Sequence, residues 1–211
     1  MKPEEYERLV NMQLYEKAVL SMGYGTVCGV DEAGRGPLAG DVYAAAVILP
    51  PDFLPEGLND SKKISEKKRE KLYDTITENA VSYAVATASV EEIDKINIRN
   101  ATYLAMRRAI NALNVPAEYA LIDGDAIKEL TLPHQCVIKG DAKCLSIAAA
   151  SVLAKVSRDR YITELSDKYP EYQFAKHKGY GTKIHTEALK KYGPCEIHRK
   201  TFLKKILGDV K

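Results

Sequence analysis

The 211-residue sequence has no tryptophan and only four cysteines. No two cysteines form a Cys-x-x-Cys pair, and a chain of this length with 45% hydrophobic residues can build a core without a disulfide framework. One spacing is typical of a metal site, that of Cys195 and His198, but a second ligand pair is missing. We therefore expect neither disulfides nor a structural zinc ion to hold this fold together.

Long apolar runs are missing as well. The longest candidates are interrupted by charged residues, and the first five residues include two glutamates where a secretory signal would have an apolar segment. These absences argue against a membrane span and an export signal, and they favour the cytoplasm. No sequence feature indicates a dimer, so we expect a monomer.

The net charge is only +2, but it is unevenly distributed. Residues 176–211 contain ten Lys or Arg and three Asp or Glu, a surplus of seven positive charges, so the rest of the chain carries a net charge of −5. A basic C-terminal segment beside an acidic remainder fits a protein that binds a polyanion and also holds a cation. A solvated, lysine-rich helix face would give the same composition.

Hydrophobic periodicity predicts an α/β fold with a central mixed sheet flanked by helices. Strand-like segments are expected at 26–30, 41–49, 81–88, 118–122 and 136–139, and helices at 4–22, 65–79, from Ser89 onward, around 103–113 and at 145–165. We divide the chain into an N-terminal helical extension at 1–25, an α/β domain at 26–170, which contains the acidic residues described next, and a small basic helical part at 171–211.

Acidic residues follow apolar strands in three places. Asp31 and Glu32 come after the first predicted strand, Asp123 after the fourth and Asp141 after the fifth. Carboxylates brought together repel one another and lose hydration, and a divalent cation removes that cost. Mg²⁺ and Mn²⁺ prefer such oxygen ligands, and two ions roughly 3.5–4 Å apart can catalyse in-line attack on phosphorus. We expect Asp31 to bridge the two ions.

Two points stay open from spacing alone. The Asp123-Gly124 pair is also typical of a simple turn, and Asp141 could merely cap the following helix. Glu32 follows Asp31 directly, and strand neighbours face opposite sides of a sheet, so its ligation of metal is less secure than that of the aspartates.

The segment from Gly29 to Gly40, Gly-Val-Asp-Glu-Ala-Gly-Arg-Gly-Pro-Leu-Ala-Gly, resembles the signature of type 2 ribonuclease H, known in bacteria as ribonuclease HII. Further motifs of that family match in the same order along residues 26 to 202. They are Asn59–Lys63, Asp123-Gly124, Lys139–Asp141, Ser146–Ser151, Lys155–Arg160, Lys178–Thr182, and His198-Arg199 with Phe202.

The resemblance implies an RNase H-like fold with a catalytic, metal-binding quartet of Asp31, Glu32, Asp123 and Asp141. It implies a metal-dependent endoribonuclease that uses Mn²⁺ or Mg²⁺. Its substrates would be RNA/DNA hybrids and duplex DNA with single embedded ribonucleotides. Cleavage on the 5′ side of the ribonucleotide would leave a 3′-hydroxyl and a 5′-phosphate.

The resemblance also points to the residues that recognise the substrate. Only the 2′-hydroxyl distinguishes the sugar of RNA from that of DNA, and glycines let a backbone approach such a small group closely. In the family, the turn that matches Gly34-Arg35-Gly36 recognises the 2′-hydroxyl. The tyrosine that matches Tyr180 stacks on the next sugar, a deoxyribose. Without the resemblance, the glycines could form a tight turn and nothing more, and Tyr180 would be one of thirteen tyrosines with no role in substrate binding.

Basic residues near the motifs are candidates for phosphate contacts. We assign such contacts to Lys62 and Arg35, and Lys63 and Lys139 are further candidates. Asp159 is expected to pair with Arg158 or Lys155 rather than bind metal, and the histidines of the basic region are not needed as catalytic bases.

Two other functions remain as alternatives. One is a nuclease or recombinase-like activity on DNA alone, since related folds support other phosphoryl transfers. The other is a non-catalytic nucleic-acid-binding module, which the presence of all four acids disfavours. An all-DNA substrate tests the first, and binding without turnover in Mn²⁺ would support the second.

Overall fold

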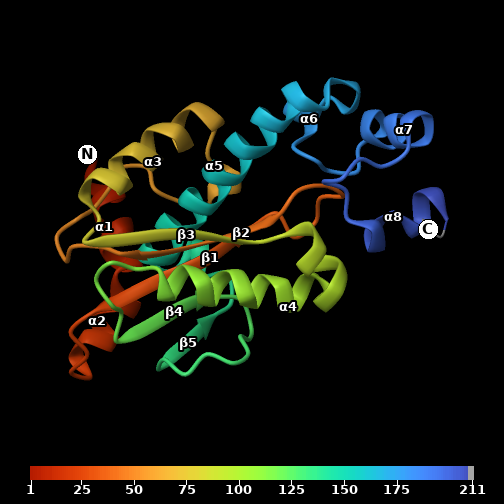
Figure 1. Ribbon diagram of the computed structural model, residues 1–211. Helices are drawn as coiled ribbons and strands as arrows, with labels where there is room; N and C mark the ends of the chain where they lie inside the picture. The colour runs from red at the N-terminus through yellow and green to blue at the C-terminus, as the bar shows by residue number, and fades with distance from the viewer. Residues whose placement is uncertain (209–211) are drawn as a thin grey trace.

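A five-stranded mixed sheet forms the centre of the molecule (Figure 1), as a computed structural model describes it for residues 1–208. Its strands follow the order β3-β2-β1-β4-β5, antiparallel from β3 to β1 and parallel from β1 to β5. The strands are β1 (Val27–Ala33), β2 (Val42–Ile48), β3 (Ser82–Ala88), β4 (Tyr119–Asp123) and β5 (His134–Val137). This confirms the predicted α/β class with a mixed sheet.

Helices cover both faces of the sheet (Figure 1). On one face lie α5 (Leu145–Lys168) and α3 (Glu66–Asn79), and on the other lies α4 (Val90–Asn111). The alternation along β1 explains the two cores: Cys28 and Val30 are buried against α4, whereas Gly29 lies against the backbone of α5. Asp31, two residues after Gly29, therefore belongs to the α5 side of the strand.

The first turns of α5 approach the sheet closely because they carry small side chains. Ala148, Ala149 and Ala150 are completely buried. A Cβ atom at Gly29 would lie 2.1 Å from the carbonyl carbon of Ser146, so glycine is required there by the closeness of the two backbones. The helix that follows Asp141 is thereby held directly against the strand that carries Asp31.

Two helices form the N-terminal extension where one was expected over residues 4–22. These helices, α1 (Pro3–Met12) and α2 (Leu14–Ser21), meet at Gln13, whose side-chain amide donates to the carbonyl of Pro51 at 2.8 Å. The carboxylate of Glu16, on α2, accepts hydrogen bonds from the N–H and the hydroxyl of Ser146, each at 2.7 Å. A carboxylate at a helix N-terminus is electrostatically favourable, so this extension anchors the start of α5.

Two other elements also differ from the sequence prediction. The capping box at Ser89 is confirmed, but the two helices expected after it join into α4 with a break at Asn97, whose φ is +65°. Strand β5 ends at Val137, two residues before the predicted end. A left-handed residue, Lys139, and a short 3₁₀ turn, η2 (Gly140–Ala142), follow it. Asp141 therefore sits on a turn rather than at the tip of a strand.

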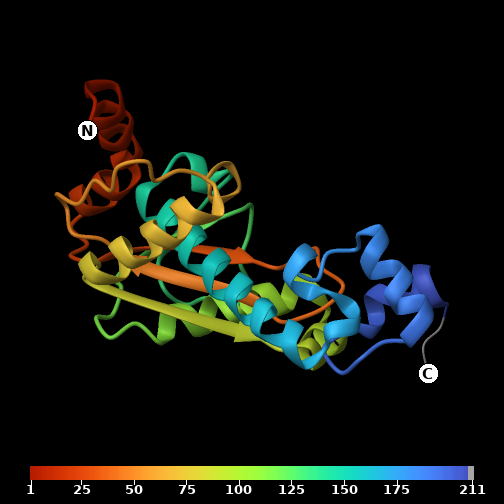
Figure 2. The same cartoon turned by 90° about the horizontal axis from the view of Figure 1, so that it is seen from above.

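The C-terminal helices lie beyond one end of the sheet, while α1 and α2 lie at the opposite end (Figure 2). They are α6 (Phe174–His177), α7 (Lys183–Tyr192) and α8 (Lys200–Leu207), joined to α5 by a 3₁₀ turn, η3 (Pro170–Tyr172). Another 3₁₀ turn, η1 (Ser61–Lys63), precedes α3. No helix within residues 1–208 combines the length and the apolar character that crossing a bilayer requires.

Candidate metal centre and substrate groove

Three carboxylates meet where β1 and β4 end. These strands are parallel neighbours, so their carboxyl ends lie at the same edge of the sheet. Oxygen atoms of Asp31, Glu32 and Asp123 all lie within 4.8 Å of one another. The structure thus brings together three of the four acids that the sequence singled out.

Glu32 reaches this cluster although it follows Asp31 directly in the strand. Its N–H donates to Oδ1 of Asp31 at 2.7 Å, and its carboxylate lies 3.4 Å from a guanidinium nitrogen of Arg35. The strand ends at Ala33, and Gly34 turns the chain with a φ of +96°. At this open edge the longer glutamate side chain shares a site with an aspartate that regular alternation would place on the other face.

Asp141 stands beside these three residues rather than among them. The N–H of Gly140 donates to Oδ1 of Asp123 at 2.6 Å, which ties the turn to the end of β4. A Cβ at Gly140 would lie 2.6 Å from the side chain of Ile147, so this close approach requires glycine. Oδ2 of Asp141 lies 3.8 Å from the ammonium of Lys62.

The carboxylates of this edge are strained electrostatically. Burial, and then the negative charges of Glu32 and Asp123, raise the pKa of Asp31 well above its usual value. Burial also raises the pKa of Glu32 despite the nearby Arg35. The pKa of Asp141 is raised by burial and then by the charges of Asp60 and Asp123. Such a site gains stability when a cation binds.

A groove with a volume of about 300 Å³ opens beside the cluster. The turn Gly34–Gly36, Lys62 and Tyr180, to which substrate contacts were assigned, all line it, whereas the other two phosphate candidates, Lys63 and Lys139, do not. Its lining consists of Glu32, Ala33, Gly34, Arg35, Gly36, Ser61, Lys62, Ser151, Lys155 and Tyr180. Gly36 lies against Tyr180, since a Cβ on Gly36 would be 3.6 Å from the tyrosine ring. The turn and the tyrosine thus form one wall.

Three polar lining residues were not predicted: Ser61, Ser151 and Lys155. The two serine hydroxyls are 2.7 Å apart and join η1 to α5, and Lys155 pairs with Asp159 at 2.8 Å, as expected for that aspartate. All three lie in motifs that the sequence resemblance covers. Their helical spacing, four residues from 151 to 155, places two of them on one face of α5.

The histidines of the C-terminal part form a separate buried group. Sγ of Cys195 lies 3.1 Å from Nδ1 of His198, whose Nε2 lies 2.9 Å from Nε2 of His185. Over the described residues 1–208, the acidic cluster is the one group of three or more His, Cys, Asp or Glu side chains arranged to hold a metal ion. Cys195 and His198 are thus within hydrogen-bonding distance of each other and lie outside the acidic cluster.

Comparison with known proteins places these features in a family. A family model described as Ribonuclease HII matches residues 28–205. The ribonuclease HII of Caldicellulosiruptor saccharolyticus is 57% identical over 192 residues, which cover 91% of this chain and 94% of that protein. The ribonuclease HII of Acetivibrio thermocellus is 50% identical over 204 residues, which cover 97% of this chain and 80% of that protein.

A solved structure agrees with the sequence comparisons. The crystal structure of ribonuclease H2 from Pyrococcus horikoshii OT3 has a TM-score of 0.71 and 28% sequence identity, covering 83% of this chain and 93% of that one. The five-stranded mixed sheet and its flanking helices are thus an RNase H-like fold. The chain belongs to the ribonuclease HII family of endonucleases.

Proposed function

We propose that this ribonuclease HII hydrolyses the RNA strand of RNA/DNA hybrids and also nicks duplex DNA on the 5′ side of a single embedded ribonucleotide. The products would carry a 3′-hydroxyl and a 5′-phosphate. The supporting observation is that Glu32 belongs to the carboxylate cluster and also lines the groove formed by Gly34, Gly36 and Tyr180. A phosphodiester held in that groove would lie next to the carboxylates.

The donor set fits a hard divalent cation. It consists only of carboxylate oxygens, and burial, followed by the charges of neighbouring carboxylates, raises the pKa of Asp31 and Glu32. Mn²⁺ or Mg²⁺ would be held by Asp31, Glu32 and Asp123, with Asp141 completing the quartet. Two such ions, when bound, would supply Lewis acidity at the scissile phosphate.

The remaining residues of the groove would bind and orient the substrate. Lys62 and Arg35 lie beside the acids and suit phosphate contacts, which add affinity but no base readout. The backbone of Gly34–Gly36 would approach the ribose, and the ring of Tyr180, 43% exposed, would stack on the following sugar. A deoxyribonucleotide at the first position would leave the backbone groups of the turn without their partner.

The direct test uses a labelled DNA duplex with one ribonucleotide, with and without Mn²⁺ or Mg²⁺. We expect a metal-dependent nick immediately 5′ to the ribonucleotide and loss of nearly all activity in Asp31→Asn. Asp52→Asn, at an exposed turn far from the cluster, is the matched control and should keep full activity. Full activity of Asp31→Asn would contradict the assignment of the cluster.

Two further substrates separate the alternatives. Cleavage of a long RNA/DNA hybrid without cleavage at a single ribonucleotide would keep the nuclease and refute the role of the Gly34–Gly36 turn. Cleavage of an all-DNA duplex would support a DNA nuclease instead. Binding of all three substrates without turnover in Mn²⁺ would leave a binding module.

A further inference from the structure

A buried arginine from the C-terminal part holds the turn that lines the groove. Arg199 is fully buried, and all five N–H groups of its guanidinium donate to backbone carbonyls. Nη2 donates to Gly34 at 2.6 Å and Nη1 to Arg35 at 3.0 Å; the other three bonds, 2.7–2.9 Å long, go to Pro37 and twice to Gly40. One side chain thus fixes four carbonyls of the segment 34–40, called here the reading loop.

These bonds determine where the other half of each peptide points. A trans peptide is planar, and its C=O and N–H point in opposite directions. Because the carbonyls of Gly34 and Arg35 point inward to Arg199, the N–H groups of Arg35 and Gly36 point away from it. Among the described residues, none accepts a hydrogen bond from either N–H. Two adjacent donors are therefore left for a ligand on the groove side of the loop.

A second buried guanidinium joins the reading loop to Tyr180. Arg158, on α5, donates to the carbonyl of Ala39 at 3.1 Å and to that of Lys178 at 3.0 Å, and its guanidinium lies 6.0 Å from the Tyr180 ring centroid. Its Nε has no hydrogen-bond partner in the described chain. The N–H of Leu38 donates to the carbonyl of Gly179, and the carbonyl of Leu38 accepts from the N–H of Arg199. These two bonds tie the reading loop to the segment that carries Tyr180 and to the start of α8.

We propose that Arg199 is a positioning residue that sets the selectivity of this enzyme for ribonucleotides, an inference that rests on the proposed function. It acts through the reading loop, by turning the N–H groups of Arg35 and Gly36 toward the sugar. Only a guanidinium offers five donors in a fixed plane, and a lysine offers three at one point. A lysine here would leave some of these carbonyls unpaired and let the peptide planes rotate.

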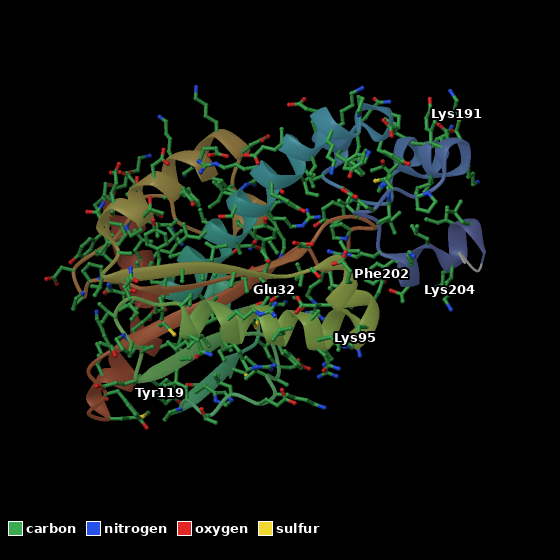
Figure 3. All side chains as sticks on the ribbon, viewed as in Figure 1. Glu32, Lys95, Tyr119, Lys191, Phe202 and Lys204 are labelled. Atoms are coloured by element: carbon green, nitrogen blue, oxygen red, sulfur yellow. The ribbon has the colours of Figure 1, made fainter. Side chains whose placement is uncertain are left out.

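The surroundings of Arg199 support a positioning role over a charge-pairing one. All five of its hydrogen bonds go to neutral carbonyls, and burial, together with the nearby charge of Arg158, lowers its pKa. Its guanidinium lies 5.2 Å above the ring of Phe202, at the start of α8, which Figure 3 labels on the sheet side of the C-terminal helices. The ring restricts the guanidinium on one face while the loop occupies its edges.

The test compares two properties of Arg199→Lys with those of the wild type. One is the single-turnover cleavage rate at a saturating concentration of duplex with one ribonucleotide. The other is the Kd for an all-DNA duplex of the same sequence. We expect the cleavage rate to fall by about tenfold or more, because small misplacement of a contact is costly. The Kd for all-DNA should stay within about twofold, since the lysines that contact phosphates are unchanged.

Controls separate positioning from general damage. Leu153→Ala destabilises the core away from the loop, and Arg160→Lys changes an exposed arginine of α5; both should keep the wild-type rate. In Arg199→Ala, millimolar guanidinium should restore cleavage, whereas methylammonium should not. Phe202→Leu removes the ring that restricts Arg199 but keeps the arginine, and it replaces the Arg199 variants in the test if they do not fold. Its cleavage rate should also be lower than that of the wild type.

Two results would overturn the inference. One is a cleavage rate of Arg199→Lys, or of Phe202→Leu where that variant carries the test, equal to that of the wild type. The other is an all-DNA Kd that rises in step with the loss of rate, which would show simple loss of folded protein. Failure of the wild type to nick the ribonucleotide duplex is a different outcome and would refute the proposed function itself.

Discussion

At the scale of single residues, Asp31 shows how a proposed metal ligand lowers the stability of the fold. Its pKa is raised by burial and by neighbouring carboxylates, so the folded protein holds the proton more tightly than the unfolded chain does. As pH rises above the ordinary value of 3.8, the unfolded state loses its proton first and the fold is progressively destabilised. At neutral pH without divalent cations the charged cluster therefore opposes folding.

Asp31→Asn should consequently be more stable than the wild type in a chelator. Asparagine keeps the acceptor for the N–H of Glu32 and removes one of the repelling charges. We expect a gain of about 1 kcal/mol, or roughly 2–4 °C in Tm for a chain of this size. Thermal unfolding with EDTA and with Mn²⁺ measures it. The wild type should gain more from Mn²⁺ than the variant, and equal gains would argue against Asp31 as a ligand.

Residue types and their order were enough to single out the four acids, whereas the proposed substrate contacts of the Gly34–Gly36 turn came only from the family resemblance. Asp123 ends β4, and Asp31 lies in β1 directly after its apolar part; such a switch from apolar to acidic is visible along the chain. The role of Arg199 was not visible, because its partners lie about 160 residues earlier and are carbonyls that every residue carries. Hydrogen bonds from side chains to a distant backbone leave no pattern in a single sequence.

At the scale of elements, the crossing of β1 and α5 sets the position of the acids. Gly29 lies two residues before Asp31 in the strand and touches the backbone of α5. Gly29→Ala would force these elements apart, because a Cβ would lie 2.1 Å from the carbonyl carbon of Ser146 and backbone cannot move aside like a side chain. We expect a destabilisation of about 3 kcal/mol.

Urea unfolding of Gly29→Ala measures that cost, and Gly25→Ala is a suitable comparison. Gly25 precedes the same strand, but its nearest neighbour to an added Cβ is 3.4 Å away, on the flexible side chain of Glu118. This variant should be close to neutral. A Gly29→Ala protein as stable as Gly25→Ala would show that α5 can shift away from β1.

The C-terminal helices depend on histidines that stay neutral. Burial lowers the pKa of His185 to about 4, and burial with the charge of His185 lowers that of His198 to about 4. Below pH 6.5 the unfolded chain therefore binds protons that the folded protein does not. Stability contributed by this group is complete above pH 6.5 and is lost as pH falls toward 4.

The expected loss from pH 7 to pH 4.5 is on the order of 3 kcal/mol. Urea unfolding at several pH values gives the slope, and His198→Asn should have a smaller slope in this window than the wild type. His134→Asn, at the exposed first residue of β5 and outside this group, should keep the wild-type slope. Equal slopes for all three proteins would place the acid sensitivity elsewhere.

The sequence predicted the elements better than their boundaries. Helix periodicity identified residues 4–22, but not the break at Gln13, which is held by a hydrogen bond to Pro51 in a distant loop. The strand leading to Asp141 was placed two residues too late, because Ile138 and Lys139 continue a β-prone pattern while Lys139 adopts a left-handed conformation. In both places a tertiary contact or a turn overrides the local pattern.

At the scale of the whole molecule, the positive charges gather at the end of the sheet where the reading loop lies. The segment 176–211 carries a surplus of seven positive charges. Helices α7 and α8, which belong to it, lie beyond that end of the sheet (Figures 1 and 2). Leu38 and Gly40 of the reading loop pair with the backbone at 197–199, which leads into α8. A duplex in the groove can therefore extend along a basic surface.

Binding should accordingly depend steeply on salt. Each phosphate neutralised contributes a slope of about −0.9 to the dependence of log K on log salt, so four contacts would weaken binding about 100-fold between about 50 and 200 mM. The double variant Lys190→Gln with Lys191→Gln, on exposed α7, should bind more weakly at low salt and have a slope smaller by up to about two. Its cleavage rate at saturating substrate should not change.

The matched control is the double variant Lys2→Gln with Lys17→Gln, which removes the same charge from α2 and the start of the chain, at the opposite end of the sheet. If binding follows the net charge of the molecule, both variants will lose affinity equally. If it follows the basic surface beside the groove, only the α7 variant will change its slope. The second outcome is expected, because exposed charges more than about 10 Å from the duplex are screened at 0.1 M salt.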